Sequence, residues 1–359
     1  MLKYKSMHKK KEIEFIFQSL FQKNRELPFL SKQEEEKIYY KISQFFLAGF
    51  VLENVCLKDQ YPLLHSKLSI LNQNLLMRKL LMLNDLADIE KEFIKRDIDY
   101  VLLKGAAYDR IKLYSNNQRH FRDIDILVKE NDLREAVYAL SFLGYRNEKQ
   151  YSLTRLKYIP QSHQIPVLIN KNKTQIDLHF RITKPDIYKN CPLTDTFFTN
   201  CEIHTKTPNM NSLVSHAMYH AFQHHEQNQG PLFIFDVLEL INASKEAEIP
   251  LDISNELNLS TQYKMLIEFA KNANKKELLD FVSYDLLKKL SNNFSWEKPP
   301  QNKFFIFSKT HKNEKNLNFK IIFNKLNNIR YTYQVNFFSI RFVLILFKEF
   351  FNSLKKIRL

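Results

Sequence analysis

The sequence predicts an α+β fold, in which a small mixed sheet lies between helical N-terminal and C-terminal regions. Changes in hydrophobic period support this prediction. Helical spacing of leucines gives way to apolar and polar alternation near residue 98, and helical spacing returns from Asn211. We therefore divide the chain into four parts: a helical region, residues 1–97, a sheet core, residues 98–183, a second helical region, residues 184–300, and a tail, residues 301–359.

The N-terminal region is expected to be helical from residue 10 to residue 97. No glycine interrupts the stretch between Pro62 and Asp99. Leucines recur there at spacings of three and four, which is the period of one helix face: Leu64, Leu68, Leu71 and Leu75, then Leu76, Leu80 and Leu83.

The core begins with a strand at Asp99–Lys104 and a helix at Gly105–Leu113. Asp123–Lys129 then alternates, which predicts a strand with its isoleucines on one face and Asp123 and Asp125 on the other. Asn131 and Asp132 are placed to cap a helix that runs through Leu143 and ends at Gly144.

A hairpin is predicted next, because two alternating runs flank the polar stretch 170–173. The first run places Ile165, Val167 and Ile169 toward the core, and the second places Ile176, Leu178 and Phe180 there. The opposite face of the second strand then carries Asp177, His179 and Arg181.

The second helical region is expected to contain helices at Leu213–His225 and Phe233–Ser244, with Pro231 at the start of the latter. Histidines recur there every fourth residue, at His216, His220 and His224. This spacing can bind a metal ion, but polar helix packing or substrate contacts are the alternative, because no cysteine or clear carboxylate partner accompanies it.

Composition restricts the class of protein. With 359 residues, 44% of them hydrophobic, the chain is long enough for two or three packed units. The three cysteines, Cys56, Cys191 and Cys201, have no paired spacing, which argues against a disulfide framework or a four-cysteine zinc site. The start of the chain lacks the apolar core of a secretory signal, and no run is apolar enough to span a bilayer. We expect a cytoplasmic protein.

The net charge of +15 is concentrated in the tail, where 12 basic and 2 acidic residues lie between Lys303 and Arg358. A helix over Phe337–Lys356 would have a broad apolar face. That face either packs on the rest of the protein or lies on the inner membrane face, and residues 303–358 could also contact a polyanion. No motif predicts sequence-specific nucleic-acid readout.

Three carboxylates on neighbouring strands form the candidate catalytic and metal site. Asp123, Asp125 and Asp177 would supply the oxygen ligands that Mg²⁺ or Mn²⁺ requires, and two such ions would clamp attacking and leaving oxygens. Asp123 and Asp125 would bridge both ions, and Asp177 would ligate one and orient or deprotonate a hydroxyl. The alternative interpretation is an exposed strand edge, because the Asp-x-Asp spacing is common.

A candidate phosphate site precedes the carboxylates. Gly105 allows close approach of backbone, Ala106 lies at the start of the helix whose free amides favour an anion, and Lys104 adds a positive charge. Arg119 and Arg122 could neutralise a triphosphate or the charge of a transition state. Ordinary solvated cations are the alternative for these three basic residues.

The combined motifs resemble the DNA polymerase beta-like nucleotidyltransferase superfamily, and within it a bacterial group of nucleotidyltransferase family proteins. The resemblance covers residues 80–245 and rests on the order of Leu103-Lys104-Gly105, Tyr114, Arg119, Asp123-Ile124-Asp125-Ile126-Leu127-Val128, Leu143-Gly144-Tyr145 and Ile176-Asp177-Leu178-His179. It implies that a histidine-bearing and an aspartate-bearing helix cover the site. His179, His220 and Asp236 are therefore our substrate-side candidates.

The resemblance implies a Mg²⁺-dependent enzyme that moves a nucleoside monophosphate from a nucleoside triphosphate to a hydroxyl of a small molecule, sugar or protein. Many superfamily members follow the glycine with serine or a second glycine, whereas this chain has Ala106 and Ala107. A non-catalytic scaffold whose basic tail binds a membrane or polyanion is therefore the alternative. A toxin-like enzyme that modifies a protein or transfer RNA would keep the chemistry and change the acceptor.

Overall fold

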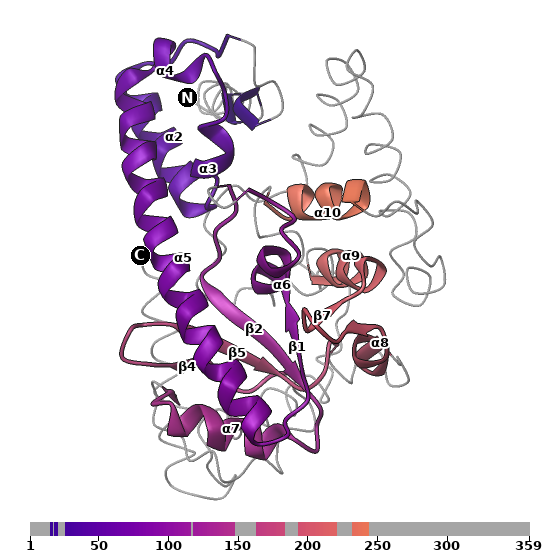
Figure 1. Ribbon diagram of the computed structural model, residues 1–359. Coiled ribbons are helices and arrows are strands. Elements are labelled where there is room, and N and C mark those ends of the chain that lie inside the picture. The colour runs from indigo at the N-terminus through magenta and orange to yellow at the C-terminus, as the bar shows by residue number, and fades with distance from the viewer. Residues whose placement is uncertain are drawn as a thin grey trace, which may run out of the picture.

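The computed structural model describes residues 15–16, 18–20, 26–115, 118–147, 163–183, 193–220 and 232–243. It confirms the α+β class, with N-terminal helices, a five-stranded mixed sheet and a small two-stranded sheet (Figure 1). The predictions for Pro231, for His224, for the far ends of the two C-terminal helices and for the basic tail lie outside the described residues.

Among the described residues, residues 15–16 and 18–20 are helical, and the helices that follow before the sheet are α2 (Lys32–Gln44), α3 (Ala48–Val51), α4 (Leu57–Gln60) and α5 (Pro62–Lys95). A capping box starts α2, because Ser31 Oγ accepts from the Glu34 amide and Glu34 accepts from the Ser31 amide at 2.8 Å. Pro62 stands at the start of α5, which runs along one side of the molecule and contacts α2, α3, α4 and α7 (Figure 1). None of the described helices has the length and apolar character needed to cross a membrane.

The main sheet has the strand order β1-β2-β5-β4-β3. Its central pair, β2 and β5, is parallel, and the other neighbouring pairs are antiparallel. The strands are β1 (Tyr100–Leu103), β2 (Asp123–Val128), β3 (Arg146–Asn147), β4 (Leu168–Ile169) and β5 (Gln175–His179). The predicted strand at Asp123–Lys129 and the hairpin around residues 170–173 are confirmed.

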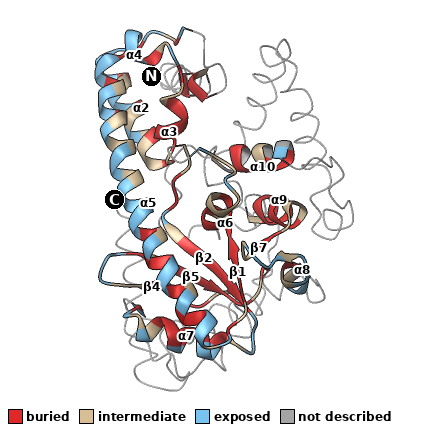
Figure 2. Ribbon diagram, viewed as in Figure 1, coloured by how far each residue is buried: buried red, intermediate tan, exposed pale blue. Residues whose placement is uncertain are grey.

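The other elements are α6 (Lys104–Arg110), α7 (Leu133–Phe142), α8 (Leu193–Thr199), β6 (Cys201–Glu202), β7 (Thr207–Pro208), α9 (Met210–Tyr219) and α10 (Leu232–Ala243). The β6–β7 sheet joins the core through the Leu102 amide, which donates to the Lys206 carbonyl at 2.7 Å. Figure 2 shows buried residues along the central strands and α6, while much of α5 exposes its outer face. The core therefore surrounds the strands that carry the candidate carboxylates.

Helix α7 begins directly after Asp132 and ends before Gly144, as predicted, but Asp132 does not cap it through its side chain. Gly144 has a φ of +86°, and the Tyr145 amide donates to the Leu140 carbonyl at 2.9 Å, which is a Schellman motif. The predicted cap at the other end is wrong, because the side chain of Asp132 makes no capping hydrogen bond. The backbone of Asp132 is already helical, so its carboxylate is not directed at the first free amides.

The first strand of the hairpin also differs from the prediction. Val167 is 36% exposed, whereas Leu168 is fully buried and pairs with Ile176. The expected alternation from Ile165 fails because Pro166, which has no backbone N–H and lies at a bend, shifts the chain by one residue. Only Leu168 and Ile169 therefore form regular strand β4.

A buried carboxylate on α5 fixes the turn of this hairpin. Asp85 is 9% exposed and accepts hydrogen bonds from Asn170 Nδ2 at 2.9 Å, from Asn172 Nδ2 at 3.0 Å and from Thr174 Oγ1. Thr174 directly precedes β5, so this network ties the start of the strand that carries Asp177 to the longest helix. We infer that α5 stabilises the register of β5.

We predict that Asp85→Ala lowers the free energy of unfolding by about 2–4 kcal/mol, because three polar groups lose their shared acceptor. Chemical denaturation measures this change. Asp88→Ala is the matched control, since Asp88 lies on the same helix, is exposed and pairs only at the surface with Lys91. The control should change stability by less than about 0.5 kcal/mol. Equal effects of the two substitutions would contradict the prediction.

Candidate functional site

Strand register brings the predicted carboxylates together. In the parallel β2–β5 pair, Asp125 lies opposite Asp177 and Leu127 lies opposite His179. Residues two apart on a strand share a face, so Asp123, Asp125, Asp177 and His179 all lie on the same face of the sheet. The sequence predicted this face for Asp177 but could not give the pairing.

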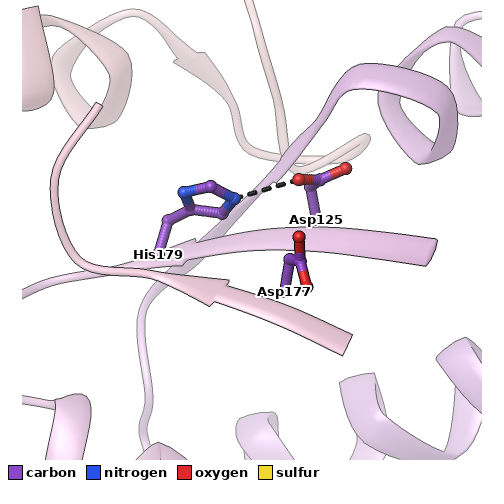
Figure 3. Close-up of side chains that lie close together, drawn as sticks. All are labelled: Asp125, Asp177 and His179. Carbon is purple, nitrogen blue, oxygen red and sulfur yellow. Dashed lines mark hydrogen bonds and ion pairs between the residues drawn. The ribbon is translucent and has the colours of Figure 1, made fainter. Parts of the chain in front are cut away.

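Asp125, Asp177 and His179 form a group whose ligand atoms lie within 4.8 Å of one another. Figure 3 shows the Asp177 side chain extending toward Asp125, with His179 beside the same carboxylate. His179 Nε2 lies 2.9 Å from Asp125 Oδ1. These two carboxylates and one imidazole could hold a metal ion. Carboxylate oxygens suit Mg²⁺ and Mn²⁺, and an imidazole nitrogen is also acceptable to Mn²⁺, so the donor set fits a divalent cation.

Asp125 is held as a carboxylate by two neighbours. Lys104 Nζ lies 2.6 Å from Asp125 Oδ1, the same oxygen that faces His179. Burial alone would raise the pKa of Asp125, but the positive charge of Lys104 and the hydrogen bond from His179 hold it well below its usual range. Because an ionised carboxylate only accepts hydrogen bonds, His179 Nε2 carries the proton in this contact.

Lys104 reaches Asp125 because of its place at the junction of β1 and α6. Leu103 pairs with Asp125 across the β1–β2 ladder, and Lys104 follows it with a φ of +46°. This left-handed conformation is uncommon for a residue with a side chain and stores backbone strain. Burial opposes the charge of Lys104, but the Asp125 and Asp123 carboxylates raise its pKa above the ordinary value.

Asp123 lies outside the group of three, although it shares their face. It is partly buried at the start of β2. Burial, followed by the negative charge of Asp125, raises the pKa of Asp123 to about 6. Its proximity to Asp125 keeps it a candidate ligand, and its carboxyl ionises at a higher pH than that of Asp125 because its pKa is higher.

The glycine of the predicted phosphate site has a packing role. A Cβ on Gly105 would lie 2.5 Å from Phe121 Cβ and 2.8 Å from Phe121 Cγ. Only a residue without a side chain fits there. A left-handed backbone is not the reason for the glycine, because the residue with a positive φ at this junction is Lys104. Ala106 is buried in α6 and offers no hydroxyl. The need for glycine is therefore explained by the Phe121 contact.

Arg119 and Asp236 meet across the molecule. Arg119 Nε lies 2.9 Å from Asp236 Oδ1 and Nη2 lies 3.0 Å from Oδ2, which is a bidentate ion pair. The Tyr114 hydroxyl donates to the same carboxylate at 3.1 Å. Burial opposes the charge of Arg119, but Asp236 raises its pKa further above the ordinary value. This pair attaches α10 to the loop that precedes β2.

The remaining candidates are Arg122 and His220, which make contacts with residues outside the group of three. Arg122 donates to the Gln44 carbonyl at 2.6 Å, and its guanidinium lies 4.2 Å from the centre of the Phe46 ring. His220 ends α9, and its ring lies 6.0 Å from that of His216, centre to centre. His216 also packs edge-on against Phe197, so helix packing accounts for this histidine.

Sequence reasoning placed His179 on the substrate side and did not predict its contact with Asp125. The signal was present, because His179 follows Asp177 by two residues and so shares its face. It also did not predict that Lys104 would contact a carboxylate. That contact depends on the pairing of Leu103 with Asp125, which is not readable from local patterns.

Asp123→Asn should stabilise metal-free protein at high pH. The pKa of Asp123 is about 6 in the folded protein, whereas its ordinary value is 3.8. Ionisation of Asp123 is therefore less favourable in the folded state, and wild-type protein loses stability as the pH rises from 3.8 through 6. The stabilisation by Asp123→Asn should be larger at pH 8 than at pH 5 by about 1 kcal/mol. Denaturation in EDTA measures it.

Asp88→Asn is the control for this experiment, because Asp88 is exposed on α5. It should change stability by less than about 0.5 kcal/mol at both pH values. A stabilisation by Asp123→Asn that is the same at pH 5 and pH 8 would show that the Asp123 carboxyl does not titrate abnormally.

Asp236→Ala should destabilise the protein by about 3–5 kcal/mol, because it leaves the buried Arg119 guanidinium without its carboxylate. The double variant Arg119→Met/Asp236→Ala removes both charges and should recover most of that loss. A double-mutant cycle measured by denaturation gives the coupling. Additive effects of the single changes would mean that the ion pair does not contribute to stability.

The chain was compared with known proteins. No curated protein matches it at a significant level of sequence similarity. A family model described as uncharacterised nucleotidyltransferase matches residues 32–274, a range that includes the whole five-stranded sheet and the group Asp125, Asp177 and His179. This match spans more than half of the sequence and implies a nucleotide substrate. The chain therefore belongs to this family of uncharacterised nucleotidyltransferases.

Proposed function

We propose that the protein is a divalent-cation-dependent nucleotidyltransferase that moves a nucleoside monophosphate from a nucleoside triphosphate to a hydroxyl group. The observation that carries this proposal is the pairing of Asp125 with Asp177 on parallel strands, within a chain of a nucleotidyltransferase family. The acceptor is a small molecule, a sugar or a protein. Mg²⁺ or Mn²⁺ is the proposed cofactor.

Asp125 and Asp177 would hold the cation, and Asp123 is the third candidate ligand. When bound, the cation would neutralise phosphate oxygens and stabilise the negative charge that develops during transfer. Asp177 is less buried than Asp125, which suits it to orient the acceptor hydroxyl or to take its proton. His179 would hold Asp125 in place by donating a hydrogen bond to Oδ1.

The proposed reaction is an in-line displacement. The acceptor oxygen would form a bond to the α-phosphorus while the bond between that phosphorus and the oxygen bridging to the β-phosphorus breaks, and pyrophosphate would leave with the bonding electrons. The hydroxyl proton would pass to Asp177 or to solvent. Lys104 supplies a fixed positive charge beside the reacting groups, and positioning accounts for the remaining catalysis.

Nucleotide binding is the first test, because it does not require the acceptor. Each of ATP, GTP, CTP and UTP, with Mg²⁺ or Mn²⁺, is added to EDTA-treated protein, and the melting temperature is measured. A nucleotide at 100 times its dissociation constant should stabilise the protein by about 2.7 kcal/mol. Asp125→Asn and Asp177→Asn should lose the cation-dependent part of this stabilisation.

Transfer is then measured as pyrophosphate release from the nucleotide that binds, in the presence of a hydroxyl-bearing acceptor. Each of Asp125→Asn and Asp177→Asn should lower the rate by about 100-fold or more, because charge stabilisation by the cation contributes several kcal/mol. Asp195→Asn, an exposed carboxylate on α8, is the matched control and should keep the wild-type rate. A rate that survives both active-site changes would refute the assignment.

A scaffold without catalytic activity is the second candidate. Its support is the phosphate side of the site, where Phe121 fills the space over Gly105 and Ala106 offers no hydroxyl. Calorimetry separates the two proposals. A scaffold should show no Mg²⁺-dependent binding of any of the four nucleotides and should bind anionic vesicles or a polyanion through residues 303–358.

A further inference from the structure

We propose that Lys104 takes the place of a second metal ion, so that the three carboxylates hold one divalent cation together with one built-in ammonium group. This inference rests on the proposed function and deepens it, because it assigns the number of cations and the role of a residue that the sequence suggested for phosphate binding. The contacts of one oxygen atom, Asp125 Oδ1, support it.

Both neighbours of Asp125 contact the same oxygen. Lys104 Nζ and His179 Nε2 lie 2.6 and 2.9 Å from Asp125 Oδ1. A carboxylate oxygen has about two acceptor sites, so these two donors fill Oδ1. No hydrogen bond or ion pair to Oδ2 occurs among the described residues. Asp125 is then able to ligate a cation through Oδ2, but it is not able to bridge two cations with one on each of its oxygens.

The charges of the site also indicate a single divalent cation. Ionised Asp123, Asp125 and Asp177 would carry three negative charges on one face of the sheet, and Lys104 Nζ lies 2.6 Å from Asp125 Oδ1 among them. With the ammonium group in place, one divalent cation completes neutralisation. A second divalent cation would have to lie beside Lys104 and would be repelled by it at short range in a poorly hydrated site.

The position of Lys104 is fixed by the fold. Its backbone is held in the left-handed region, with a φ of +46°, by the junction of β1 and α6. Gly105, the residue that follows Lys104, packs directly against Phe121, so there is little space for this part of the backbone to move. The lysine side chain is 20% exposed, and the carboxylate it contacts is 2% exposed. An ammonium group in this setting acts as a permanent part of the site.

The test is a count of bound Mn²⁺ in the full chain, read from the electron paramagnetic resonance signal of free Mn²⁺ in a titration without nucleotide. Wild-type protein should bind one ion per chain at the carboxylate site. Lys104→Met, which keeps the length of the side chain and removes its charge, should bind two. Lys104→Arg keeps the charge and should bind one.

Controls keep the test decisive. Lys91→Met removes an exposed lysine of α5 and should leave the count at one. Lys104→Gly provides a second charge-free variant that tolerates a positive φ, in case Lys104→Met does not fold, and it should also bind two ions. Circular dichroism confirms the fold of each variant.

Two ions in the wild-type protein would overturn the inference and leave the proposed function intact. One ion in the folded charge-free variants would also overturn it, whatever their affinity, because Lys104 would then only weaken binding. Loss of all Mn²⁺ binding, in wild type and variants, would remove the metal site and with it the proposed function. The two failures are therefore distinguishable.

Discussion

The structure depends on the parallel pairing of β2 with β5, which places Asp125 opposite Asp177. Two carboxylates at such close range repel each other, so the arrangement requires nearby positive charge. The fold maintains the pairing from outside the site, because Asp85 on α5 binds the turn that precedes β5. A helix of 34 residues therefore contributes to a site formed by two strands of 5 and 6 residues.

Charge compensation explains the conformation at the end of β1. Lys104 adopts a left-handed backbone, and in that conformation its ammonium group reaches the buried Asp125 carboxylate. Strained residues persist where the surrounding structure holds them and are common at functional sites. Gly105 serves the same junction by making room for Phe121. Each residue of the Lys-Gly sequence thus has a structural role at the junction of β1 and α6. Lys104 contacts the carboxylate site, and Gly105 makes room for Phe121.

Local patterns predicted the parts of the fold whose interactions are local. Alternation assigned the strand of Asp125 and the face of Asp177, and Gly144 marked the end of α7. Other contacts join residues that are distant in sequence. Arg119 and Asp236 are 117 residues apart, and residues of that separation are brought together by the packing of whole elements. No period or spacing encodes such a pair. The error at Val167 had a local cause, since Pro166 interrupts the alternation.

Crystals of the full chain soaked in Mn²⁺ would test the central claim most directly, because manganese scatters anomalously and its position is found without assumptions about ligands. The account predicts an anomalous peak within coordination distance of both Asp125 and Asp177. A protein that shows no peak at this place, or whose only peak lies away from both carboxylates, would contradict the claim that β2 and β5 form a cation site.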